Sequence, residues 1–398
     1  MDMKTDTQIM HKFDECMFLN RLGMVVLGIW PLDGRAPRLR IATSKIRLGI
    51  VYFFMMVLLC VQWFDMYSLW GNVEANTETF LSNAFTFAVM MKLSSYVKYE
   101  DTFRDIMQSM RANWRRVMNE AEPHNKDIMY NATVTARSRS NKYFLVTGAT
   151  AVLYITMPFL RDSSFRDRKY PFFGKYYFDR DSDVVYLVCY MSQILTGSII
   201  GLATHVTDTT FLICTYHFCA QLQILHNDFM DLDYDDHLVG RSYLISLIKR
   251  HQAEIRSAEA LQSMFSQSSL QQILLSCLMI CVNGFKLIVS LSNQDADVVM
   301  YLVCLVLTLL QILCYCEPGN ELIVQSQSLD EAIYQSAWIK MDKNSIKNLS
   351  FIIQRSQKPV AITAGSIYEL SLQNFMQIVK ASMSGLSMLQ AVYHRRDN

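Results

Sequence analysis

The sequence has little charge. Of its 398 residues, 18% are Asp, Glu, Lys or Arg, whereas soluble domains average about 25%. The 37 basic and 36 acidic residues leave a formal net charge of +1, so the long-range attraction to phosphate that a nucleic-acid binder needs is missing. A hydrophobic content of 51% and a mean hydropathy of +0.14 instead indicate a membrane protein, and no nucleic-acid partner is expected.

Sequence motifs for catalysis and metal binding are missing as well. The chain contains no Walker loop, GxGxxG, HExxH or GxSxG motif, and no Cys/His cluster with zinc spacing. All ten cysteines except Cys16 lie in apolar stretches and read as buried apolar residues. His205 and Asp208 come closest to an acid/base couple, with a structural and a functional interpretation both open. The sequence therefore predicts no enzyme, catalytic residue, cofactor or metal.

Seven stretches are long and apolar enough to span a bilayer as helices. They cover 46–64, 80–97, 143–160, 184–204, 270–292, 298–316 and 366–391. Lys92 and Lys286 fall inside such stretches, and we expect them to extend to the inner and outer membrane faces. The polar N-terminus lacks the pattern of a cleaved signal peptide. An all-α integral membrane protein with seven transmembrane helices is predicted.

The distribution of basic residues predicts the orientation of these spans. The alternate connections that begin with 1–45 hold 25 Lys and Arg, against 8 in the opposite set, although 161–183 alone holds six. Basic residues stay on the cytoplasmic side, so we expect a cytoplasmic N-terminus and an extracellular C-terminus. This orientation is the reverse of that in G-protein-coupled receptors. The long inner connections have helical apolar spacing, which predicts helices that extend below the membrane.

The last predicted span has a polar stripe. Lys380 lies near its middle, and Gln373, Gln377, Ser384 and Ser387 accompany it at helical spacings. Protein or water must cover such a face inside a bilayer. A central buried helix and a pore-lining helix are both compatible with this pattern.

Aromatic residues gather in the outer halves of the second to sixth spans. The deeper ones are Phe87, Tyr154 and Tyr190, whereas Phe80 and Tyr301 lie nearer the span ends. Ligand sites in helix bundles are mostly apolar with a few polar groups, so these residues are candidates for a pocket. Aromatics at span ends also form interfacial belts, and this alternative stays open.

A set of residues near the end of the chain stands in a distinctive order and spacing. They are Tyr334, Ser336, Trp338, Arg355, Pro359, Thr363, Gly365, Leu370, Phe375, Lys380 and Ser384. This set resembles the closing signature of insect odorant receptors. The resemblance also includes elements of the fourth span and its extension, at Tyr190–Gln193 and Gln221–Leu225. It covers essentially the whole chain, and is strongest over the last part.

The resemblance implies an odorant-gated, non-selective cation channel, in which a tuning subunit joins a co-receptor subunit in a heterotetramer. It implies a single seven-helix unit over 1–398, made of a cytoplasmic N-terminus (1–45), spans one to six (46–316), cytoplasmic anchor helices (317–365) and a pore-lining span (366–391). The implied partners are a volatile ligand, membrane lipid and permeant cations. The implied location is the cell membrane of an olfactory neuron dendrite.

The resemblance also implies roles for individual residues. The implied odorant pocket comprises Phe80, Phe87, Tyr154, Met157, Tyr190, Ile194 and Tyr301. The implied pore and gate comprise Lys380, Ser384, Met388 and Val392, and the subunit anchor comprises Tyr334, Trp338, Leu370 and Phe375. The chain lacks the long insertion that marks the co-receptor, so it resembles a tuning subunit. A gustatory-type channel subunit, a polytopic transporter and a G-protein-coupled receptor are the alternative readings.

Overall fold

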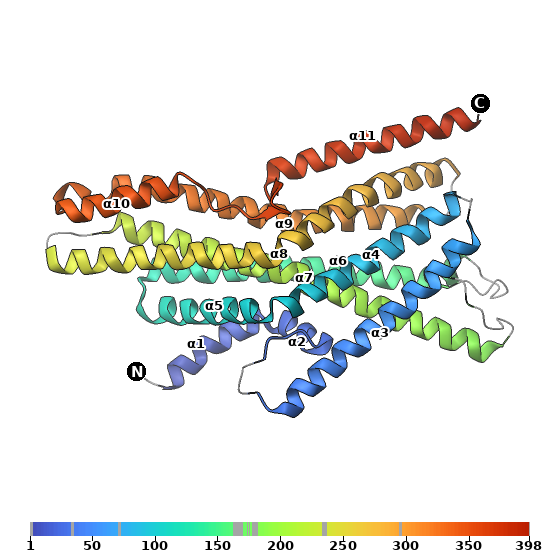
Figure 1. Cartoon of the computed structure of the whole chain (residues 1–398), viewed down its shortest axis with the longest axis horizontal. Helices are drawn as coiled ribbons and strands as arrows, with labels where there is room; N and C mark the ends of the chain where they lie inside the picture. Colours follow the sequence, from blue (N-terminus) through green and yellow to red (C-terminus); the bar gives the residue numbers. More distant parts are fainter. Residues whose placement is uncertain are drawn as a thin grey trace.

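The computed structural model describes residues 3–32, 36–70, 73–161, 170–172, 174, 176, 182–232, 237–293 and 297–397. The chain in these ranges is almost entirely helical (Figure 1). Its elements are α1 (Met3–Cys16), α2 (Phe18–Leu27), α3 (Arg38–Ser68), α4 (Val73–Lys98), α5 (Glu100–Glu120), α6 (Pro123–Arg161), α7 (Asp183–Met230), α8 (His237–Asn293), α9 (Val298–Gln335), η1 (Trp338–Lys340), α10 (Lys343–Ser356), β1 (Thr363–Ala364), β2 (Tyr368–Glu369) and α11 (Leu372–Asp397). The all-α prediction is confirmed.

Each predicted span lies in a helix of its own, apart from the first few residues of the last span, which form β2 and the turn before α11. Four helices, α3, α7, α8 and α9, are long and apolar enough to cross a membrane by composition alone. Polar residues lower the hydropathy of α4, α6 and α11, and the sequence of α4 shows this with Lys92 and Asn83 in its interior. Hydropathy alone therefore finds only part of the bundle.

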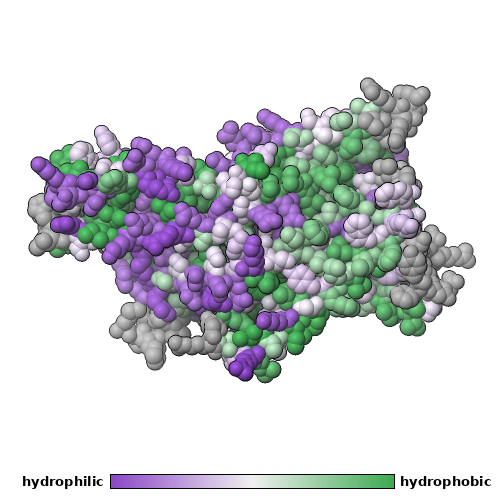
Figure 2. Space-filling model, viewed as in Figure 1, coloured by the Kyte–Doolittle hydropathy of each residue, from purple (hydrophilic) through white to green (hydrophobic). Residues whose placement is uncertain are grey.

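Apolar and polar surfaces divide the molecule into two parts. Figure 2 shows hydrophobic residues over one end of the long axis and hydrophilic residues over the other. The hydrophobic end holds α3, α4 and the later part of α8, and the hydrophilic end holds α5 and α10 (Figure 1). The N- and C-terminal ends of the trace lie toward opposite ends of this axis, as an odd number of crossings requires.

Helix α7 forms the centre of the bundle. Nearly every residue from Ala203 to Leu225 is buried, because α6, α8, α9, α4 and α2 pack around this stretch. Several of its threonines satisfy their hydroxyls within the helix: Thr207, Thr209 and Thr210 each donate to the carbonyl four residues earlier. These polar residues can thus be buried with their hydroxyl groups hydrogen-bonded.

The hydrophilic end has a smaller apolar core of its own. Leu225 and Phe229 of α7, Leu244 and Leu247 of α8, and Ile333 of α9 meet there. The helices that were predicted for the long inner connections are present in this region. Helix α10 completes the core, and Asp342 caps its first turn by accepting a hydrogen bond from the Asn344 backbone N–H at 3.1 Å.

A tight contact fixes the start of α11. A Cβ atom on Gly319 of α9 would lie 2.3 Å from the Leu370 carbonyl oxygen, so glycine is required for this approach. Beyond it, Ile378, Ser382 and Leu386 of α11 are buried, and Leu386 lies on the α8 side of the helix. The opposite side of α11 lies at the edge of the molecule (Figure 1).

Candidate ligand-binding site

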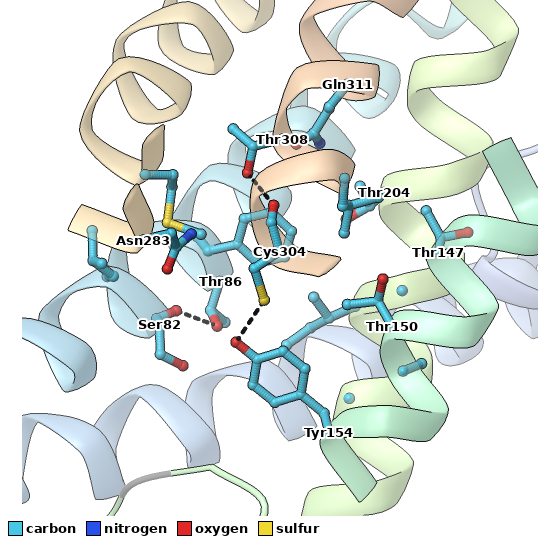
Figure 3. A pocket seen from close by; sticks show the side chains of 18 of the residues that line it. Ser82, Thr86, Thr147, Thr150, Tyr154, Thr204, Asn283, Cys304, Thr308 and Gln311 are labelled. Atoms are coloured by element: carbon cyan, nitrogen blue, oxygen red, sulfur yellow. Dashed lines mark hydrogen bonds between the residues drawn. The ribbon is translucent and has the colours of Figure 1, made fainter. Parts of the chain in front are cut away.

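A cavity of about 170 Å³ lies among α4, α6, α7, α8 and α9, at the hydrophobic end of the molecule (Figure 3). Its apolar walls include Leu81, Phe85, Ile155, Phe172, Leu275 and Met300. Polar side chains are interspersed among them, and the close-up shows several that reach toward the space between the helices. Ligand sites in helix bundles have this composition.

Tyr154 is the aromatic anchor of the cavity wall. Its ring stacks on Phe172 with 5.7 Å between centroids and 18° between planes. The Cys304 thiol lies 3.7 Å from the Tyr154 hydroxyl, which fixes the ring from the α9 side. Gly201 of α7 lines the same space, and a Cβ there would have nothing within 4 Å. Small residues opposite a large ring thus leave the volume open.

The α4 wall of the cavity carries a charge that is matched. Glu78 accepts a hydrogen bond from the Tyr301 hydroxyl at 2.8 Å and lies 3.3 Å from the Lys286 ammonium. Glu78 precedes the predicted span 80–97, so this ion pair is compatible with the expectation that Lys286 extends to the outer membrane face, and that expectation stays a prediction. Among the described lining residues, the cavity presents no unmatched charge.

A second ion pair lies behind the cavity. The Lys92 ammonium is 2.5 Å from Asp208 Oδ1, with the two side chains 3% and 0% exposed. Asp208 also accepts hydrogen bonds from Tyr143 at 3.1 Å, Gln311 at 2.9 Å and Tyr315 at 2.6 Å. Gln311 lines the cavity as well, so one amide links the ligand space to the buried ion pair.

This cluster corrects two sequence-based interpretations. Lys92 does not extend to the membrane face, because Asp208 holds its ammonium in the interior. Asp208 does not pair with His205, whose two ring nitrogens have no hydrogen-bond partner and whose ring stacks on Tyr143 instead. A lysine inside one predicted span and an aspartate just beyond the end of another, at position 208 after the span 184–204, were the signal that could have revealed the pair.

The predicted pocket residues divide into three groups. Tyr154 and Tyr301 line the cavity. Phe80 and Phe87 do not, because they project from another face of α4 and are 48% and 55% exposed. Tyr190 and Ile194 lie on α7 outside the lining, and Tyr190 donates to the Ile155 carbonyl at 2.8 Å. The Met157 side chain lies outside the described residues.

Sequence reasoning missed the polar members of the wall. Gln272, Ser276 and Asn283 of α8, Thr204 of α7, and Gln311 of α9 line the cavity. Their helical spacing along α8, four and then seven residues, was a usable signal. The search for aromatic residues passed over it.

A family comparison decides what kind of protein carries this cavity. A family model described as a 7tm odorant receptor matches residues 72–383, which is more than half of the chain. This chain belongs to that family of odorant receptors. The seven predicted spans are thereby confirmed, and the receptor is a multi-pass membrane protein.

Individual relatives of the receptor are insect odorant receptors. Odorant receptor 13a of Drosophila melanogaster is 24% identical over 288 residues, which cover 66% of this chain and 69% of that protein. Odorant receptor Or2 of Anopheles gambiae is 31% identical over 147 residues, which cover 37% and 38%. The aligned stretches span only 58% and 56% of two further Drosophila relatives, putative odorant receptor 92a and odorant receptor 67c.

The receptor also shares its fold with a solved structure. The insect olfactory receptor OR5 from Machilis hrabei, in complex with eugenol, matches with a TM-score of 0.77 at 14% sequence identity. The match covers 96% of this chain and 99% of that one. A likeness at this level of identity establishes the arrangement of helices and not the ligand.

The residues of the receptor that were predicted to line a pore lie on the outer side of α11. Lys380, Ser384 and Met388 are exposed in the single chain, while the Val392 side chain lies outside the described residues. Ile378, Ser382 and Leu386 form the buried side of the same helix. The polar stripe of α11 therefore does not pack inside its own chain.

The predicted anchor residues occupy different environments. Tyr334 is 72% exposed, and the Trp338 indole donates to the Tyr334 carbonyl at 3.0 Å. Phe375 is half-buried. Leu370 is fully buried against Gly319, so it stabilises the receptor internally and is not available to contact another subunit.

Proposed function

We propose that this receptor is an odour-tuned subunit of a non-selective cation channel, gated by a volatile, mainly apolar molecule in the cavity. The cavity between the helices, with its mostly apolar lining, is the observation that supports this proposal. Moving an apolar molecule from water into such a space is favourable, by about 25 cal/mol for each Å² of apolar surface removed from water. A ligand shifts the channel equilibrium only to the extent that it binds the open state more tightly.

Helix α8 provides a physical connection between the cavity and α11. Asn283 lines the cavity, while a Cβ on the next residue, Gly284, would lie 3.1 Å from Leu386 of α11. Two residues before Asn283, the Cys281 thiol donates to the Ser382 carbonyl of α11 at 3.1 Å. A small shift of α8 around a ligand would therefore be transmitted directly to α11.

The exposed side of α11 supports its assignment as the pore-lining helix of an assembly. A polar face within a bilayer must be covered by protein or water, and its own chain does not cover Lys380 or Ser384. Several subunits that direct this face toward a common axis would enclose an aqueous path. We assign a cytoplasmic anchor to residues 317–365 together with the parts of α7 and α8 that form the smaller core at the hydrophilic end. We infer that a co-receptor supplies the other subunits.

A cysteine accessibility experiment tests this function. Ser384→Cys is expressed with the co-receptor, and odour-evoked currents are recorded before and after a charged, externally applied thiol reagent. Loss of the current only when the reagent is applied with the odorant is expected. Leu302→Cys is the control, because Leu302 is exposed on α9, away from α11, and should be insensitive.

Two results would contradict the proposal. One is a current that depends on G-protein signalling. The other is silence toward a broad panel of volatiles from a subunit that reaches the cell surface with its co-receptor.

A further inference from the structure

Two polar groups in the cavity wall have no hydrogen-bond partner. They are the amide nitrogen of Asn283 and the hydroxyl of Thr204. The two residues are only 7% and 3% exposed. Leaving a buried donor without a partner destabilises the folded protein, so native structures rarely retain one without a function.

Thr204 differs from the other threonines of the cavity. Thr86, Thr150 and Thr308 also line it, and each donates its hydroxyl to the carbonyl four residues earlier, at 2.8 to 2.9 Å. Thr204 lies on a regular helix and has an equivalent carbonyl, yet makes no such bond. Its hydroxyl therefore has unused hydrogen-bonding capacity in a residue that lines the cavity.

Asn283 and Thr204 lie on different walls of the same space. Figure 3 shows Asn283 on the α8 side and Thr204 on the α7 side, with Cys304 between them in the view. The charged lining residue Glu78 is matched by Lys286 and Tyr301, and Asp208 behind the wall is matched by Lys92. The available recognition groups in the described wall are thus neutral, which favours a neutral ligand.

The size of the cavity limits the ligand further. A cavity of about 150 Å³ in another protein admits benzene. The space of about 170 Å³ here therefore fits one small ring or a short chain with an oxygen substituent.

We infer, on the basis of the proposed odorant-gated function, that the cavity recognises a small neutral volatile through a hydrogen-bond-accepting oxygen, which takes a hydrogen bond from the Asn283 amide. Ketones, aldehydes and esters carry such an oxygen. The Thr204 hydroxyl supplies a second hydrogen bond, to the same oxygen or to another polar atom of the ligand. A pure hydrocarbon fills the same space but leaves both donors unsatisfied.

Matched pairs of volatiles test this inference. Acetophenone is compared with α-methylstyrene, and 2-heptanone with 2-methyl-1-heptene, so that within each pair a carbonyl oxygen is replaced by a CH₂ group of similar size. Odour-evoked currents of the full-length subunit with its co-receptor give the potency of each compound. The ratio of potencies within a pair is then compared between variants, because differences in partition from water cancel.

Asn283→Leu should shift the potency ratio about tenfold against the ketone, the loss expected for one hydrogen bond in a buried site. Asn283→Ala should do the same, which guards against a folding defect specific to the larger side chain. Thr204→Val should shift the ratio about two- to fivefold. Thr196→Val is the matched control, since Thr196 of α7 is not among the lining residues and its hydroxyl is already bonded to the Ser192 carbonyl, and it should leave the ratio unchanged.

An unchanged ratio in both Asn283 variants that reach the surface would overturn the inference while leaving the channel function intact. So would a wild-type subunit that responds to the alkenes and not to the ketones. Silence of the wild-type subunit toward every volatile, despite surface expression with its co-receptor, would overturn the proposed function itself.

Discussion

The buried ion pair between Lys92 and Asp208 gives the sharpest prediction of stability. The two side chains are 3% and 0% exposed and their charged atoms lie 2.5 Å apart. Removing one partner of a buried pair costs about 3–5 kcal/mol, because the other charge is left without its counterion. This is a large part of the roughly 5–15 kcal/mol that stabilises a typical protein, so Lys92→Met should sharply reduce the amount of folded receptor.

Asp208→Asn should cost at least as much as Lys92→Met. Three further donors, from Tyr143, Gln311 and Tyr315, point at the carboxylate. Whichever way its amide is turned, an asparagine has an acceptor oxygen at only one of the two carboxylate oxygen positions. Its NH₂ group occupies the other position and faces one of these donors. The lysine would lose its counterion and keep at most a neutral amide oxygen as acceptor, besides its position 5.6 Å from the centroid of the Tyr315 ring.

The double variant Lys92→Met/Asp208→Asn decides whether the charge pairing is responsible. It contains no unpaired charge, and its cost should fall to about 1–3 kcal/mol for the donor that stays unsatisfied. Stability is measured by unfolding of the purified full chain in lipid nanodiscs, together with the fraction at the cell surface. Lys98→Met is the control, since Lys98 is exposed at the end of the same helix, and should change stability by less than about 0.5 kcal/mol. A double variant whose cost equals the sum of the single costs within about 0.5 kcal/mol would refute this reasoning.

Two further predictions concern the first half of α8 and the start of α11. Burial raises the pKa of Glu254, in the first half of α8 and outside the predicted span, to about 7, although Arg116 and an Asn113 hydrogen bond act in the opposite direction. The folded pKa lies above the unfolded value near 4.5, so the contribution of Glu254 to stability is greatest at low pH and is lost as the pH rises through 7, by about 3 kcal/mol in all. Glu254→Gln should therefore flatten this part of the pH profile of unfolding. An unaltered profile would contradict the assignment. Gly319→Ala should lower the unfolding midpoint by the equivalent of about 1–3 kcal/mol, because the new methyl group would overlap the Leu370 carbonyl. Gly49→Ala is the control and should have little effect, since a Cβ at this position meets nothing within 4 Å.

The helices of the receptor could be predicted from the sequence more reliably than its site. Long apolar stretches specify membrane spans wherever they fold, because unsatisfied backbone groups cannot enter lipid. Lys92 was placed in the correct span, but its environment was misjudged. Which way a lysine side chain turns depends on whether a neighbouring helix presents a carboxylate, and Asp208 lies 116 residues further along the chain.

The pocket shows the same limit. Tyr154 and Tyr301 were identified correctly as lining residues, whereas Phe80 and Phe87 lie on other faces of α4. An aromatic residue in a span can face lipid, a neighbouring helix or a cavity, and hydropathy is the same in all three cases. Only the rotation of α4 against α8 and α9 selects among them.

The sequence by itself predicted a helical membrane protein with seven spans. Apolar length accounts for α3, α7, α8 and α9, because the bilayer imposes the same requirement on every segment independently of its neighbours. Helices α4, α6 and α11 are more polar, and the family match supports them as spans. The orientation with a cytoplasmic N-terminus is likewise a prediction from the charge distribution alone. Tertiary structure decided which polar side chains are matched and which are not. Hydrogen bonding is directional and short in range. Only the packed helices therefore show that Asp208 has four hydrogen-bonding partners, whereas the Asn283 amide nitrogen and the Thr204 hydroxyl have none.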